Sequence, residues 1–143
     1  MKYFYSRSSL DKLYTCHLDL QTILLKLIEV VDVKIIWGWR GEELQNQFFE
    51  AGTSEKAWPS SLHNTLDKDN KPCSLAVDIA PYYPQAPHIR WNDHEGFIYV
   101  AGYFMGIAHM LDIKVRNGND WDGDNNLHNQ RFFDRGHFEL RRQ

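Results

Sequence analysis

The sequence has little cysteine and no uninterrupted hydrophobic run long enough to cross a membrane. Its two cysteines, Cys16 and Cys73, can form one disulfide at most, and neither lies in a Cys-x-x-Cys pair. This favours two reduced thiols in a protein made in a cytoplasm. The most apolar stretch, from Ile23 to Ile36, is interrupted by charged residues, so it predicts no transmembrane helix.

The sequence also lacks an excess of basic residues. Sixteen lysines and arginines against 19 aspartates and glutamates give a net charge of −3, and the pI is near 6.1. We therefore expect no nucleic-acid partner and no insertion into a membrane. The N-terminus has no apolar segment followed by a small-residue cleavage site, so we expect no export signal.

The length of 143 residues and the hydrophobic fraction of 43% are those of one soluble domain with a substantial core. We expect a single domain over residues 1–143 and a monomer. The sequence contains no repeat, low-complexity tract or linker that would divide it.

Helices and short strands are predicted in an irregular order. Apolar residues between Leu20 and Val31 recur every three to four positions, which indicates an amphipathic helix, and the β-branched run Val33–Trp37 indicates a strand. Without a regular β-α-β rhythm, the predicted fold class is α+β, with a small antiparallel sheet and flanking helices. The other expected elements are helices from Glu42 to about Glu50 and from Glu95 to Met110, and strands over Ser74–Ile79, Ile113–Val115 and Gly136–Leu140.

Two long segments are predicted to be loops. The stretch from Thr53 to Pro72 is polar and contains His63, and the stretch from Asn117 to Asn126 is rich in Gly and Asp. The second loop resembles a calcium-binding loop that starts at Asp120, but the glycine and glutamate that an EF-hand requires are absent. We expect a solvated loop over Asp120–Asn126, with contact to calcium or substrate left open.

Three residues form a candidate zinc site. His63, Asp78 and His137 supply two imidazoles and one carboxylate, the type of ligand set that leaves one coordination position of zinc free for water. Asp78 and His137 fall on predicted strands and His63 in a predicted loop, so only the fold can bring them together. This pattern predicts metal-assisted hydrolysis.

Further polar residues flank these candidate ligands. Asp134 lies three residues before His137 and is the candidate general base. Glu139 lies two residues after His137, so on a strand both point to one face; it either orients an imidazole or is an ordinary surface carboxylate. Ser61 precedes His63 by two residues, and we expect it to make a hydrogen bond near the metal rather than to act as a nucleophile.

The order of short motifs resembles that of the M15 peptidases. The chain contains Gly-Trp-Arg, then Ser-x-His, Ala-Val-Asp and Asp-x-x-His-Phe-Glu, and the likeness extends from about Leu18 to Leu140. This family includes D-Ala-D-Ala carboxypeptidases and dipeptidases and the phage L-alanyl-D-glutamate endolysins. The endolysin branch is the most similar, because the chain is short and reads Ala-Val-Asp-Ile-Ala-Pro-Tyr after the predicted strand.

The resemblance implies a hedgehog/DD-peptidase-like fold and assigns roles to the candidate residues. By that likeness His63, Asp78 and His137 bind Zn²⁺, Asp134 is the catalytic base, and Arg40 stabilises the developing oxyanion. The implied substrate is the peptidoglycan stem peptide, cut between L-Ala and D-Glu. An enzyme of this kind waits in the host cytoplasm and reaches the cell wall after the membrane has been permeabilised.

Two other functions remain open at the level of sequence. The same metal site would suit a D-Ala-D-Ala carboxypeptidase or dipeptidase. From a different class, the chain would be a non-catalytic binding module that zinc stabilises. The presence of Asp134 argues against the latter, because a structural zinc site needs no base and usually takes four protein ligands.

Overall fold

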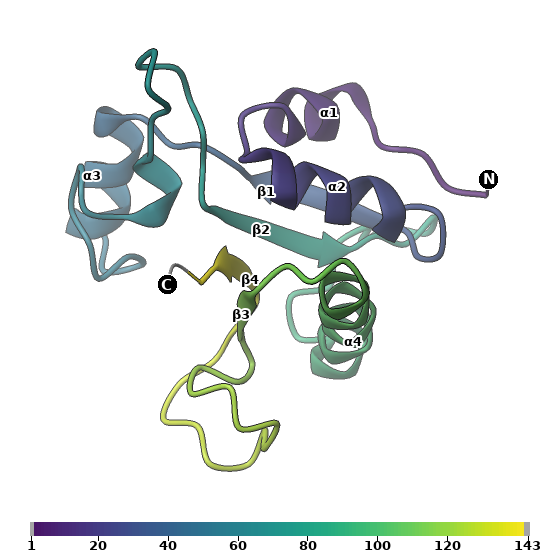
Figure 1. The fold of residues 1–143 in the computed structure, drawn as a ribbon. Coiled ribbons are helices and arrows are strands. Elements are labelled where there is room, and N and C mark those ends of the chain that lie inside the picture. Colours follow the sequence, from purple (N-terminus) through teal and green to yellow (C-terminus); the bar gives the residue numbers. More distant parts are fainter. Residues whose placement is uncertain (1, 142–143) are drawn as a thin grey trace.

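The computed structural model describes residues 2–141, which form a four-stranded sheet covered by helices (Figure 1). The helices are α1 (Arg7–Leu13), α2 (Leu18–Leu27), α3 (Glu42–Glu50), α4 (His94–Met110) and the 3₁₀ turn η1 (Leu62–Asn64). The strands are β1 (Val33–Trp37), β2 (Ala76–Pro81), β3 (Val115–Gly118) and β4 (Asp134–Leu140).

All strand pairs of the sheet are antiparallel, and the strands lie in the order β1-β2-β4-β3. The two central strands are therefore β2 and β4, which are more than fifty residues apart in the sequence. Val77 of β2 lies opposite Phe138 of β4, and Asp78 lies opposite His137. Because side chains alternate between the faces of a strand, the first pair points to one face and the second pair to the other.

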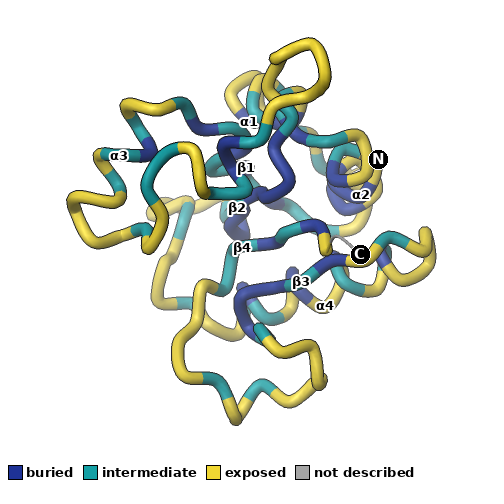
Figure 2. The backbone as a smooth tube through the Cα atoms, turned by 60° about the vertical axis from the view of Figure 1, so that its left-hand side comes forward, coloured by how far each residue is buried: buried dark blue, intermediate teal, exposed yellow. Residues whose placement is uncertain are grey.

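Helices α4, α2 and α1 cover the face to which Val77 and Phe138 point. Helix α4 packs against β2, β3, β4 and α2, while α1 packs against β1. The ring of Phe104 on α4 stacks on Phe138 with 3.9 Å between centroids, at the centre of the core. Figure 2 shows that the buried segments lie on the sheet and on the inward sides of the helices, and that the exposed segments are mainly loops. The core thus leaves the face with Asp78 and His137 available for a site.

The predicted α+β class with an antiparallel sheet is confirmed, and most predicted elements are present. The strand expected over Ile113–Val115 was wrong: it starts at Val115 and continues to Gly118. The reason is a turn after α4, where Asp112 has a φ of 55° and the N–H of Ile113 donates to Ala108. Asn117 and Gly118, expected in a loop, consequently belong to β3.

Helix α1 was not predicted. It has 7 residues, too few for its apolar positions to show a helical period. The side chain of Ser6 caps it by accepting a hydrogen bond from the N–H of Ser9.

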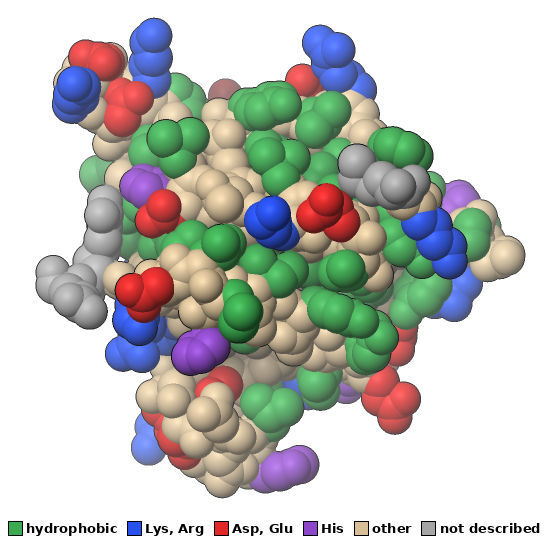
Figure 3. All heavy atoms as spheres, turned by 45° about the vertical axis from the view of Figure 1, so that its right-hand side comes forward, with side chains coloured by type: hydrophobic (Ala, Val, Ile, Leu, Met, Phe, Trp, Pro, Cys, Tyr) green, Lys and Arg blue, Asp and Glu red, His purple; other side chains and the backbone are tan. Residues whose placement is uncertain are grey.

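Within residues 2–141, no helix combines the length and the apolar character needed to cross a membrane. On the face that Figure 3 shows, hydrophobic side chains reach the surface in groups among charged and polar ones. Scattered exposed hydrophobic side chains of this kind are normal on protein surfaces.

The stacked pair of Phe104 and Phe138 yields a stability prediction. Phe104 is fully buried, so Phe104→Ala should lower the free energy of unfolding by about 3–5 kcal/mol, measured by urea denaturation. Met110→Ala, on the same helix but 83% exposed, should change it by less than about 0.5 kcal/mol. A loss below about 1 kcal/mol for Phe104→Ala would contradict the assigned core.

Candidate metal centre and catalytic residues

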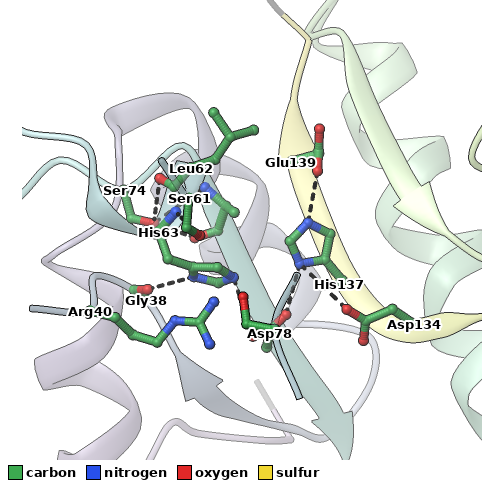
Figure 4. A network of polar contacts seen from close by, with 12 residues as sticks. Gly38, Arg40, Ser61, Leu62, His63, Ser74, Asp78, Asp134, His137 and Glu139 are labelled. Carbon is green, nitrogen blue, oxygen red and sulfur yellow. Dashed lines mark hydrogen bonds and ion pairs between the residues drawn. The ribbon is translucent and has the colours of Figure 1, made fainter. Parts of the chain in front are cut away.

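The pairing of β2 with β4 brings two of the candidate ligands together. Asp78 and His137 are register partners, and the Nδ1 atom of His137 lies 3.0 Å from Oδ1 of Asp78. Val77 and Ile79 on either side of Asp78 are buried in the core, which fixes the strand and directs the Asp78 carboxylate to the opposite face. Figure 4 shows these two side chains pointing toward each other from adjacent strands.

His63 approaches the same carboxylate from the loop before β2. Its Nε2 atom lies 3.3 Å from Oδ2 of Asp78, and its Nδ1–H donates to the carbonyl oxygen of Gly38 at 2.8 Å. That bond fixes the tautomer, so Nε2 carries the free lone pair that a metal ligand needs. The side chain of Ser61 accepts a hydrogen bond from the backbone N–H of His63 at 3.2 Å and therefore orders the turn rather than the ring.

Buried amides attach this turn to α3 and to the segment before it. Asn64 donates from Nδ2 to the carbonyl of Arg40 at 3.0 Å and to Oε1 of Gln45 at 3.2 Å. Arg40 returns a bond from its backbone N–H to the carbonyl of His63 at 2.8 Å. Gln45 is fully buried and also bonds Ser54. These bonds give the loop a fixed conformation although it contains no regular strand.

The three donor groups have the spacing of a metal site. Their ligand atoms all lie within 4.8 Å of one another. In a tetrahedral zinc site with bonds of about 2.0–2.1 Å, neighbouring ligand atoms lie roughly 3.3 Å apart. Here Nε2 of His63 lies 3.3 Å from Oδ2 of Asp78, and Nδ1 of His137 lies 3.0 Å from Oδ1 of Asp78. The Nε2 atom of His63 is buried and has no hydrogen-bond partner, which a native structure seldom tolerates without a ligand. The group could hold a metal ion.

The charges within this cluster depend strongly on one another. Burial alone would raise the pKa of Asp78, but the charges of His63 and His137 and the hydrogen bond from His137 outweigh it and lower that pKa. Burial opposes protonation of His137, yet its hydrogen bonds to Asp78 and Glu139 raise its pKa to about 10. Without a metal ion, His137 therefore keeps a proton on the atom that faces Asp78, and a metal ion would have to displace it.

The outer side of His137 is held by a second set of contacts. Its Nε2–H donates to Glu139 at 2.9 Å, and Arg116 donates to the other oxygen of Glu139 at 2.8 Å. The ring of Trp121 lies 5.6 Å from that of His137. Arg116 and Trp121 were not identified from the sequence. The predicted strand ended before Arg116, and the pairing of Arg116 with Glu139 depends on strand register. The imidazole is thus oriented from both sides.

Asp134 stands beside the cluster at the edge of a groove. One of its oxygens lies 3.9 Å from Nδ1 of His137, and its side chain is 58% exposed. Partial burial and the neighbouring carboxylate of Asp78 raise its pKa. The groove has a volume of about 540 Å³, and its walls include Trp37, Trp91, Asp78 and Asp134. Asp134 therefore lies beside the candidate metal ligands and borders a space that can take a ligand.

Arg40 lies on the other side of the cluster. Only 9% of it is exposed, and its guanidinium lies over the ring of Phe48. Figure 4 shows the guanidinium beside His63 and Asp78. Burial lowers the pKa of Arg40, while the charges of Asp78 and Asp134 raise it; an arginine remains cationic under such influences. A fixed positive charge thus stands next to the candidate metal ligands.

The loop over Asp120–Asn126 reaches the site through Trp121, whose ring lies beside that of His137. The carboxylates of Asp120, Asp122 and Asp124 lie within 4.8 Å of one another, but they are largely exposed. Asp120 and Asp124 accept hydrogen bonds from backbone N–H groups of the same loop. Whether this loop contacts calcium or substrate stays an untested prediction.

Comparison with known proteins agrees with this geometry. A family model described as phage L-alanyl-D-glutamate peptidase matches residues 1–141. The L-alanyl-D-glutamate peptidase of Escherichia phage T5 is 32% identical, over 98% of this chain and 99% of its own length. The crystal structure of the Serratia marcescens L-Ala D-Glu endopeptidase ChiX has the same fold, with a TM-score of 0.74, 20% identity, and coverage of 98% of this chain and 92% of that one. The chain therefore belongs to the phage L-alanyl-D-glutamate peptidase family.

Proposed function

We propose that this protein is a peptidoglycan-degrading zinc endopeptidase, an endolysin that hydrolyses the amide between L-Ala and D-Glu in the stem peptide. The observation that carries the proposal is the convergence of His63, Asp78 and His137 beside Asp134 at the edge of the groove. The family and the phage T5 relative are both named for this bond, which supports the choice of substrate.

Zinc suits the donor set, and His63, Asp78 and His137 are the residues that would hold it. Two nitrogens, one carboxylate and one open position are the composition of a catalytic rather than a structural zinc site. When bound, zinc would supply Lewis acidity and lower the pKa of a coordinated water to about 7. The hydrogen bonds that His63 donates to Gly38 and that His137 donates to Glu139 would keep both imidazoles in the tautomer that ligation requires.

Asp134 would move the proton of the attacking water. Its carboxylate, which lies 3.9 Å from His137, would accept that proton and then deliver it to the amine of the departing D-Glu residue. Its raised pKa suits both steps, because a carboxylate of very low pKa would be a weak base and would hold the proton poorly. The exposed position beside the groove gives it access to the substrate.

Arg40 would stabilise the oxygen of the scissile amide as it gains negative charge. Its guanidinium is fixed by burial and by the contact with Phe48 before the substrate arrives. A preoriented donor of this kind typically contributes about 10²- to 10³-fold in kcat. Arg40 would thus stabilise the charge on the oxygen of the amide, and Asp134 would protonate its nitrogen.

The groove favours an endopeptidase over a D-Ala-D-Ala carboxypeptidase. A carboxypeptidase needs a cation that receives a free terminal carboxylate. Arg135 lines the groove, but its guanidinium already donates to Asn119 at 2.7 Å and lies over the ring of Phe133.

Action on the cell wall would follow release from the host cytoplasm once the membrane is permeabilised. A non-catalytic module would have no use for Asp134.

Digestion of purified peptidoglycan tests the proposed function. The zinc-loaded protein should solubilise the wall, and mass spectrometry should find stem fragments with a new D-Glu amino terminus. A chelator should abolish the reaction, and added zinc should restore it. Release of free D-Ala with the L-Ala–D-Glu bond intact would instead establish the carboxypeptidase.

The role of Asp134 is tested by Asp134→Asn. This variant should fold and bind zinc like the wild type, yet lose roughly 10²-fold or more in kcat, because an amide cannot accept the proton. Asp112→Asn, at an aspartate after α4 whose side chain is 90% exposed, is the matched control and should keep full activity. If Asp134→Asn retained activity within a few-fold, another residue would have to be the base, with Glu139 examined first.

A further inference from the structure

A bulge in β4 brings Asp134 close to His137. In a regular strand, residues three apart point to opposite faces and are separated by roughly 10 Å. Here, however, an oxygen of Asp134 lies 3.9 Å from Nδ1 of His137. The register explains this: Asn117 of β3 pairs with Phe138, whereas the next residue, Gly118, pairs with Asp134, so residues 135–137 leave the β3–β4 ladder.

Two buried asparagines satisfy the backbone that the bulge removes from the ladder. Asn117 donates from Nδ2 to the carbonyl of His137 at 2.9 Å and to that of Arg135 at 3.3 Å. Asn119 donates from Nδ2 to the carbonyl of Arg135 at 3.3 Å and to Oδ1 of Asn117 at 2.8 Å. Exposures of 4% and 1% leave no room for water to replace these bonds, so the two amides determine the path of the bulge.

The residues around these amides complete the contact. A Cβ atom on Gly118 would collide with the carbonyl group of Asp134, so only glycine lets β3 approach the backbone of Asp134 this closely. The side chain of Arg135 donates to Oδ1 of Asn119 at 2.7 Å. Asn117, Gly118 and Asn119 together therefore contact Asp134, Arg135 and His137 of the bulge.

We propose that Asn117, Gly118 and Asn119 form a positioning clamp that holds the bulge of β4 and thereby places the carboxylate of Asp134 at the reacting water and amide. None of the three lines the groove or belongs to the His63–Asp78–His137 group, so they would act through Asp134. The inference rests on the proposed function, because it explains how the proposed catalytic base, Asp134, is held in position.

A double-mutant cycle on kcat separates this role from a general structural one. Asn119→Ala is the variant of choice, because Asn119 bonds the carbonyl of Arg135 and not that of the ligand His137. On a soluble stem peptide that contains the L-Ala–D-Glu bond, it should lower kcat roughly 10- to 100-fold. Zinc content, measured by elemental analysis, should stay at the wild-type value.

The same substitution is then made in the Asp134→Asn protein. If Asn119 acts by placing Asp134, its effect on kcat should shrink to within about twofold once that carboxylate is gone. An equal fold loss in both backgrounds, or a loss that follows the zinc content, would overturn the clamp. Asn129→Ala, in the same loop but exposed, is the matched control and should leave kcat unchanged.

A second variant guards against loss of the fold. Asn119→Asp is nearly isosteric and keeps an acceptor for Arg135, but it lacks the Nδ2–H that bonds the carbonyl of Arg135. It should reproduce the same cycle, and full activity in this variant would contradict the proposal. An inactive wild-type chain would overturn the proposed function together with the clamp, whereas an active wild type with equal losses would overturn the clamp alone.

Discussion

The site depends on one partly buried carboxylate that two imidazoles share. Asp78 lies on a central strand whose neighbouring side chains are in the core, so it cannot move away from His63 and His137. An ionised carboxylate in such surroundings is costly unless opposite charges compensate it. The imidazoles do so in the metal-free protein, and a divalent cation would do so more completely. The same requirement explains why each imidazole has a further fixed partner, the carbonyl of Gly38 for His63 and Glu139 for His137.

The fold separates packing from chemistry across a single sheet. The face toward α4 carries the stacked Phe104 and Phe138, which stabilise β4, while the opposite face of the same strand carries His137. The candidate residues Asp78, Asp134 and His137 thus lie on strands, whereas His63 lies in the turn η1 and Arg40 in the segment between β1 and α3. Buried amides hold that turn and that segment together. Arg40 and Asp134 flank the cluster on opposite sides (Figure 4), an arrangement that suits attack on one atom of an amide and protonation of another.

Much of the fold and of the candidate site could be predicted from the sequence, because the candidate ligands and the helix and strand periods are local patterns. The α+β class, the long α4 and the family followed from them. Strand register and the bulge of β4 could not be predicted, since they depend on contacts between distant residues. Sequence spacing alone suggested that Asp134 is a neighbour of His137, whereas a regular strand would have separated them; Asn117 and Gly118, expected in a loop, supply the missing constraint.

The central claim is that His63, Asp78 and His137 together bind one zinc ion. Calorimetric titration of the metal-free protein with zinc tests it most directly. We predict one zinc per chain, with an affinity that falls as the pH is lowered, because the pKa of His137 is raised to about 10 and zinc must displace its proton. His137→Ala and Asp78→Ala should lose this binding, whereas His109→Ala, an exposed histidine on α4, should retain it. Full zinc stoichiometry in both ligand variants would contradict the account.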